Sequence, residues 1–80
     1  MRLRLVLDPK TRVYEGTATT PDAQWNVRAD IASDDDVTLE TDAPADVADY
    51  TRRVVRIAVR AAKADGTPTP RVIQRWRAPQ

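Results

Sequence analysis

The sequence contains no cysteine, no histidine and no phenylalanine, and only two glycines. Without cysteine, the chain has no disulfide and no thiolate that could act as a nucleophile or metal ligand. Without histidine, it lacks the commonest general base and the commonest transition-metal ligand. Two glycines are too few for a glycine-rich loop that cradles phosphate. These absences predict a protein that is not an enzyme and that holds no cofactor or metal.

Long hydrophobic runs are also missing. No stretch approaches the roughly 18 consecutive apolar residues that a membrane-spanning helix needs. The first ten residues alternate arginine with apolar residues and lack the continuous apolar run of a signal peptide. We therefore expect a cytoplasmic protein with no membrane partner.

Length and composition predict one small folded unit. Eighty residues suffice for a single domain, residues 1–80, with a thin hydrophobic core. Hydrophobic residues make up 41% of the chain and charged residues 31%, which is typical of a soluble globular protein. Since the only aromatic residues are two tryptophans and two tyrosines, the core must consist mostly of aliphatic side chains.

Alternation of apolar and polar residues predicts four strands in the first half of the chain. The alternation is clearest at residues 24–32. Its apolar face there consists of Trp25, Val27, Ala29 and Ile31. Shorter patterns cover residues 2–7, 12–19 and 37–40, with turn sequences between the first three strands. Gly16 interrupts the second strand and indicates a bulge or the close approach of a neighbouring strand.

A helix is predicted after Ala43. Thr41 or Asp42 is expected to cap its beginning, and Pro44 suits its first turn. Gly66 is expected to supply the left-handed residue that stops the helix. The tetrapeptide before the fourth strand, residues 33–36, is rich in aspartate but lacks the glycine and the closing glutamate of a calcium loop. We interpret it as a polar loop tip.

A fifth strand is predicted at residues 71–77. Alternation points Val72 and Trp76 inward, although Ile73 breaks the pattern. The element order is therefore β-β-β-β-α-β, an α+β fold in which a four-stranded antiparallel meander carries one amphipathic helix on one sheet face. We expect the fifth strand to pair antiparallel beside the first strand; pairing beside the fourth strand is the alternative.

Charge is distributed unevenly, although the net charge is only +1. Residues 1–50 hold five cationic and eleven anionic side chains, which gives −6, whereas residues 51–80 hold eight and one, which gives +7. Such asymmetry says nothing about the fold, but it indicates a charged partner or self-association.

The predicted helix has one cationic face. At 100° per residue, its cations share an arc of about 100°. These residues are Arg52, Arg53, Arg56, Arg60 and Lys63. The apolar arc, which includes Ile57, is expected to lie on the sheet, with Val59 as an exception beside the cations. Two interpretations of the cationic face stay open: a solvated surface, or a surface that binds an anionic partner.

A second cationic surface follows if the strand alternation holds. The sheet face opposite the helix would then carry Arg2, Arg4, Arg12, Tyr14, Arg28, Arg71, Arg75 and Arg77. Arginines and an exposed aromatic ring on an open sheet are one way in which proteins bind single-stranded nucleic acid. The alternative is that acidic residues on neighbouring strands neutralise these cations.

We therefore expect a small non-enzymatic protein-interaction module of regulatory, assembly or inhibitor type. It would dock onto another protein, or onto a copy of itself, through the basic helix face or an exposed sheet edge. Sequence-independent nucleic-acid binding, through the helix cations or the arginine-rich sheet face, is the alternative function.

Overall fold

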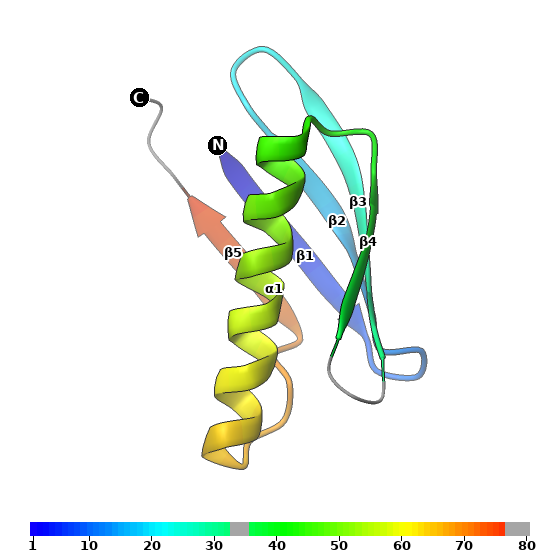
Figure 1. Ribbon diagram of the computed structural model, residues 1–80, viewed down its shortest axis with the longest axis vertical. Coiled ribbons are helices and arrows are strands. Elements are labelled where there is room, and N and C mark those ends of the chain that lie inside the picture. Colours follow the sequence, from blue (N-terminus) through cyan, green and yellow to red (C-terminus); the bar gives the residue numbers. More distant parts are fainter. Residues whose placement is uncertain (33–35, 77–80) are drawn as a thin grey trace.

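The computed structural model describes residues 1–32 and 36–76. Its elements, in chain order, are β1 (Arg2–Asp8), β2 (Val13–Thr19), β3 (Gln24–Ile31), β4 (Val37–Thr41), α1 (Ala45–Asp65) and β5 (Val72–Trp76) (Figure 1). All strands pair antiparallel in one sheet with the order β4-β3-β2-β1-β5. The predicted α+β architecture and the position of the last strand beside the first are thus confirmed. Part of the predicted loop tip, residues 33–35, and Arg77 lie outside the described residues.

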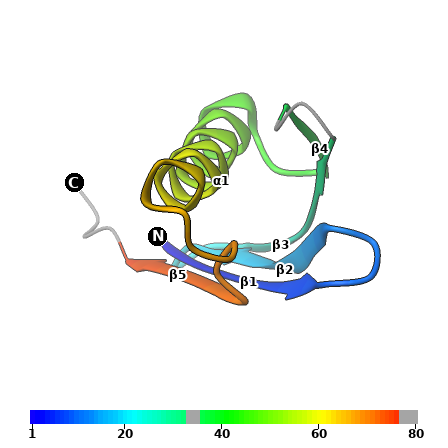
Figure 2. The same cartoon turned by 90° about the horizontal axis from the view of Figure 1, so that it is seen from below.

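The helix covers one face of the sheet. Figure 2 shows α1 lying across this inner face, with β4 turned up toward the helix, and no described element over the opposite, outer face. The core lies between α1 and the inner face, where Leu3 and Leu5 of β1 are fully buried beneath Val55 and its neighbours. The outer face is therefore left uncovered by the described elements.

The helix is rotated relative to the sequence-based expectation. Its buried residues are Val47, Thr51, Val54, Val55, Ala58, Val59 and Ala62. Val59 is thus buried, and Ile57 is 58% exposed, so the predicted buried arc was wrong by a rotation of about 50°. The rotation brings Val59 into the core cluster and moves Ile57 into solvent. Thr51 is buried as well, and its hydroxyl donates to the Val47 carbonyl at 2.8 Å. That hydrogen bond satisfies the hydroxyl and lets threonine join the buried face.

The two ends of α1 are capped in different ways. Gly66 stops the helix in the left-handed conformation, with φ of 68°, as predicted. The N–H groups of Gly66 and Thr67 donate to the carbonyls of Lys63 and Ala62, which is the Schellman pattern. At the beginning, the predicted side-chain cap was wrong: Pro44 occupies the cap position, and no side chain in residues 1–32 or 36–76 caps the helix.

Tyr14 points inward rather than outward. In the β1–β2 register Tyr14 faces Leu7 and shares the inner face with Gly16 and Ala18. Tyr14 is fully buried, and its hydroxyl donates to the carbonyl of Pro70 in the segment before β5. Its predicted exposure on the outer face was therefore wrong.

The β5 side chains alternate in the opposite sense to the prediction. Ile73 lies opposite Leu5 in the sheet register and is buried, whereas Val72 and Trp76 are 46% and 68% exposed on the outer face. Leu5 belongs to the centre of the core, so the residue paired with it is drawn under α1. The broken pattern at Ile73 was the correct signal, and the inward prediction for Val72 and Trp76 was wrong.

Candidate interaction surfaces

The solvent-facing side of α1 is a continuous cationic surface. We name it the α1 stripe; it consists of Arg52, Arg53, Arg56, Arg60 and Lys63, all of which are exposed. Within the described part of the chain, none of its four arginine side chains forms a hydrogen bond or an ion pair. Asp49, one turn earlier on the same side of the helix, does not pair with Arg52 or Arg53 either. The four arginines are thus exposed together, and no described residue neutralises their charge.

Ile57 adds an apolar centre to this cationic surface. It follows Arg53 by four residues and precedes Arg60 by three, so the three side chains are neighbours on the helix surface. At about 100° per residue, Ile57 lies at the edge of the predicted apolar arc, and the observed rotation of the helix moves its side chain into solvent. The only sequence signal was Val59, which lay among the cations and could become buried only by that rotation.

The outer face carries a second cationic surface over β1 and β5. A shallow hollow of about 470 Å³ lies there, which we name the β1–β5 hollow. Its lining consists of Arg2, Leu3, Arg4, Gln74, Arg75 and Trp76. Arg2 pairs with Trp76 and Arg4 with Gln74 in the sheet register, so these four side chains share the outer face. The hollow therefore combines arginines with an exposed indole ring, and none of its described lining residues is acidic.

The predicted arginine-rich face is only partly assembled. Arg2, Arg4 and Arg28 lie on the outer face, as expected from their strand positions. Arg71 and Arg75 lie on the same side of the strand as the buried Ile73, which is the side of the inner face, so the predicted outer position of these two arginines was wrong. Arg12 lies in the β1–β2 turn with φ of 57°, and its guanidinium donates to the Ala32 carbonyl at 3.5 Å. The aromatic residue of this face is Trp76 and not Tyr14.

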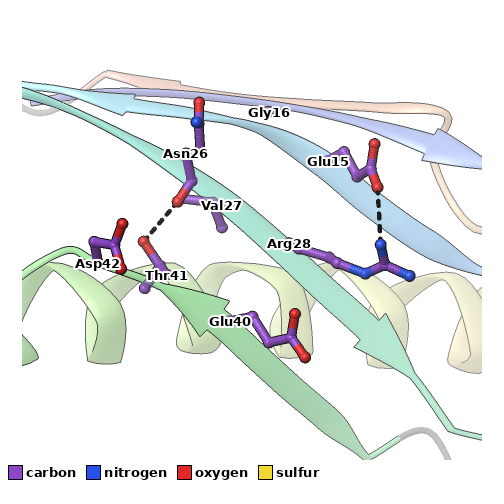
Figure 3. A pocket seen from close by; sticks show the side chains of 8 residues that line it. All are labelled: Glu15, Gly16, Asn26, Val27, Arg28, Glu40, Thr41 and Asp42. Atoms are coloured by element: carbon purple, nitrogen blue, oxygen red, sulfur yellow. Dashed lines mark hydrogen bonds and ion pairs between the residues drawn. The ribbon is translucent and has the colours of Figure 1, made fainter.

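The opposite end of the outer face is acidic. Figure 3 shows a second hollow over β2, β3 and β4, with Glu15, Glu40 and Asp42 around its rim and Thr41 bonded to the Asn26 carbonyl at 2.7 Å. Arg28 reaches Glu15 at 3.3 Å, so its charge is compensated within the sheet. The outer face is thus cationic and aromatic at β1–β5 and anionic toward β4.

The buried phenol is a structural feature and takes no part in these surfaces. Burial raises the pKa of Tyr14, because the phenolate would lose its hydration in the core. In residues 1–32 and 36–76 no three acidic side chains converge closely enough to hold a metal ion. Nor does α1 offer the long apolar stretch that a membrane-spanning helix requires.

Comparison with known proteins gives no relative to which this chain can be assigned. No protein-family model matches the sequence, and neither a curated protein nor a solved structure is similar to it. The function has to be inferred from the surfaces themselves.

Proposed function

We propose that this protein is a small non-enzymatic interaction module that docks the α1 stripe onto an acidic surface of another protein. One observation carries the proposal: the four arginines of the stripe lie exposed on one helix face, without an ion-pair partner among the described residues. A guanidinium group forms bidentate, charge-assisted hydrogen bonds with a carboxylate. An acidic protein surface is therefore the complementary partner.

Ile57 favours a protein over a nucleic acid as this partner. The centre of a protein interface is apolar and is surrounded by a polar rim. Ile57, 58% exposed between Arg53 and Arg60, has this arrangement on a small scale. Complete burial of such a side chain contributes about 1.5–3 kcal/mol. A phosphate backbone offers arginine a partner but offers isoleucine none.

The proposal is tested in two steps. Affinity capture with the immobilised protein identifies its partner, and calorimetric titration with the purified partner then measures the dissociation constant. The triple variant Arg52→Glu, Arg56→Glu, Arg60→Glu should weaken binding by at least about 100-fold, because attractive charges become repulsive. Ile57→Ala should weaken it by about 10-fold through lost apolar burial.

A matched control separates the α1 stripe from the other cationic surface. The double variant Arg2→Glu, Arg4→Glu reverses charge on the outer sheet face and leaves α1 unchanged, so it should bind as tightly as the wild type. Circular dichroism checks that every variant is folded. If the triple variant keeps its affinity, or if the sheet variant alone loses it, the stripe is not the docking surface.

Nucleic-acid binding is the second candidate function, and one observation favours it. Trp76 is 68% exposed on the outer face beside Arg2, so an aromatic ring and cations lie together over the β1–β5 hollow. Bases stack on such rings while arginines contact phosphates. Labelled single-stranded and duplex DNA should then bind at about 50 mM salt, with affinity falling steeply as salt rises. Trp76→Ala should abolish single-strand binding, and the absence of any shift with either probe removes this candidate.

A further inference from the structure

The sheet has two edge strands, β4 and β5, and hydrogen bonding fixes which of their backbone groups are free. In an antiparallel ladder, residues alternate between those that bond to the neighbouring strand and those whose N–H and C=O groups point the other way. Because β4 and β5 each have a paired strand on one side only, every second residue directs its backbone groups outward. Such edges are sites at which another strand can add.

On β5 the outward groups belong to Val72, Gln74 and Trp76. The Leu7 N–H donates to the Arg71 carbonyl at 2.7 Å, which identifies Leu7 and Arg71 as a hydrogen-bonded pair. Alternation along the register then directs the next residue, Val72, and every second residue after it away from β1. The Arg75 guanidinium donates to the outward carbonyl of Gln74 at 2.8 Å. Among the residues that the structure describes, this edge is covered only by one contact with a cationic side chain of its own.

On β4 the outward groups belong to Val37, Leu39 and Thr41. The Ala32 N–H donates to the Asp36 carbonyl at 2.9 Å, so Asp36 and every second residue after it face β3. The Asp36 carboxylate accepts the outward N–H of Val37 at 3.0 Å. This edge too has one of its groups covered by a charged side chain of its own, here an anionic one.

The two edges carry opposite charge. The charged residues on and next to β4 in the described chain are Asp36, Glu40 and Asp42. Those on and next to β5 are Arg71 and Arg75, with Arg2 and Arg4 on the adjacent strand β1. Two β5 edges repel each other, and so do two β4 edges, but a β4 edge attracts a β5 edge. A second copy of this chain is thus the occupant that fits.

We propose that β5 of one copy pairs with β4 of a second copy, in parallel, so that the sheet continues from one molecule into the next. In the alternating order of the sheet, β4 and β5 run in the same direction, so a copy in the same orientation brings them together in parallel. In a parallel pair, aligned residues share a face, and only one of the two directs its backbone groups at the partner strand.

The side-chain faces satisfy this requirement. The side chains of Gln74, Thr38 and Glu40 all lie on the outer face of the sheet. The backbone N–H and C=O groups of Gln74 point away from β1, toward the free edge, whereas those of Thr38 and Glu40 point toward β3. Gln74 therefore aligns with Thr38 or Glu40 of the second copy, and the two helices stay on the same side of the sheet. The acidic residues of β4 then extend the cationic β1–β5 hollow. Because the two contacting edges differ, the contact is heterologous and repeats from copy to copy.

Sedimentation of the purified, nuclease-treated protein tests the proposal. The wild type should form a series of oligomers that grows with protein concentration and dissociates at high salt. Gln74→Pro removes an N–H that points away from β1, so the fold is retained and the β5 edge is blocked. Arg75→Glu blocks the same edge by charge and leaves the β1–β5 backbone hydrogen bonds in place. Thr38→Lys with Glu40→Gln makes the β4 edge cationic. Each variant should weaken association at least about 10-fold.

Mixing the variants identifies a heterologous contact. Gln74→Pro retains its β4 edge, and the Thr38→Lys, Glu40→Gln variant retains its β5 edge, so an equimolar mixture should give a dimer that neither forms alone. The α1 triple variant should assemble like the wild type, since its edges are unchanged. A wild type that remains monomeric up to millimolar concentration overturns the proposal. So does a mixture that stays monomeric, or loss of assembly in the α1 variant alone.

Discussion

Replacing Gly16 by alanine should destabilise the protein severely, because the pairing of β1 and β2 leaves no room for a side chain there. Gly16 lies between Leu5 of β1 and Val27 of β3 in the sheet. A Cβ atom would overlap the Arg4 carbonyl oxygen and would lie 2.8 Å from the Arg4 carbonyl carbon and 2.9 Å from the Leu5 Cα. All three are backbone atoms, so no change of rotamer relieves the overlap and one of the strands has to move.

The size of the effect follows from this geometry. Overpacking usually costs 1–3 kcal/mol, and because the obstacle is backbone we expect about 3 kcal/mol or more. At roughly 0.05–0.15 kcal/mol per residue, the free energy of unfolding of a domain this small is about 4–12 kcal/mol. A domain of this size loses about 4–8 °C in melting temperature per kcal/mol. The midpoint of thermal unfolding should therefore fall by at least about 12 °C.

Thermal and urea unfolding followed by circular dichroism measure this loss, and the second glycine provides the control. Gly66 has φ of 68°, and a Cβ atom there would meet nothing within 4 Å. Gly66→Ala therefore costs only the left-handed backbone strain, about 1–2 kcal/mol. If Gly16→Ala is as stable as the wild type, or more stable than Gly66→Ala, then β1 does not pack as closely against Gly16 as the structure indicates.

Four further substitutions test the packing, the exposed ion pair and the pH dependence. Tyr14→Phe removes the hydroxyl bonded to the segment before β5 and should cost about 1 kcal/mol in urea unfolding. Because burial raises the Tyr14 pKa above its ordinary value of 10.0, its contribution to stability is complete below pH 10 and is lost as the pH rises through the folded-state pKa. The phenylalanine variant should lose less stability over that alkaline range, and an unchanged pH profile would contradict the burial. Val59→Asp should cost several kcal/mol or unfold the protein, whereas Ile57→Asp should cost less than about 1 kcal/mol; equal losses in urea unfolding would contradict the rotation of α1. Arg28→Ala should change the free energy of unfolding by less than about 0.5 kcal/mol, since this exposed ion pair with Glu15 is solvent-screened, and a larger loss would show that the pair is structural.

Local patterns in the sequence were sufficient for the fold. The alternation at β1 and β3, the stop at Gly66 and the adjacency of β5 to β1 all depend on neighbouring residues or on simple topology. The errors lie where tertiary contacts decide between near-equal local options. Arginines of β5 are exposed whichever of its two faces is turned toward the core. Only the alignment of Ile73 with Leu5 shows which face of β5 packs under α1. Similarly, Val13 and Tyr14 are adjacent and both buried, so alternation alone could not orient the tyrosine.

The candidate surfaces were predictable to different degrees. The α1 stripe depends only on helical spacing, and its residues lie exposed as expected. Its apolar centre, Ile57, was not predictable, because helical spacing places Ile57 at the edge of the apolar arc and only the packing of Val59 into the core shows the rotation of α1. The second cationic surface needed the orientation of β5, so the sequence selected Tyr14 where the structure has Trp76. The opposite charges of the two sheet edges are visible only once the strand order is known.

The most direct test of the α1 stripe as the docking surface is a nuclear magnetic resonance titration of the isotope-labelled protein with its captured partner. The arginine Nε–H signals report on each guanidinium group separately. The signals of Arg52, Arg53, Arg56 and Arg60, together with the Ile57 methyl groups, should shift or broaden on binding, while those of Arg2, Arg4 and the Trp76 indole should stay in place. Shifts confined to the outer sheet face, with the α1 signals unchanged, would contradict the proposed function.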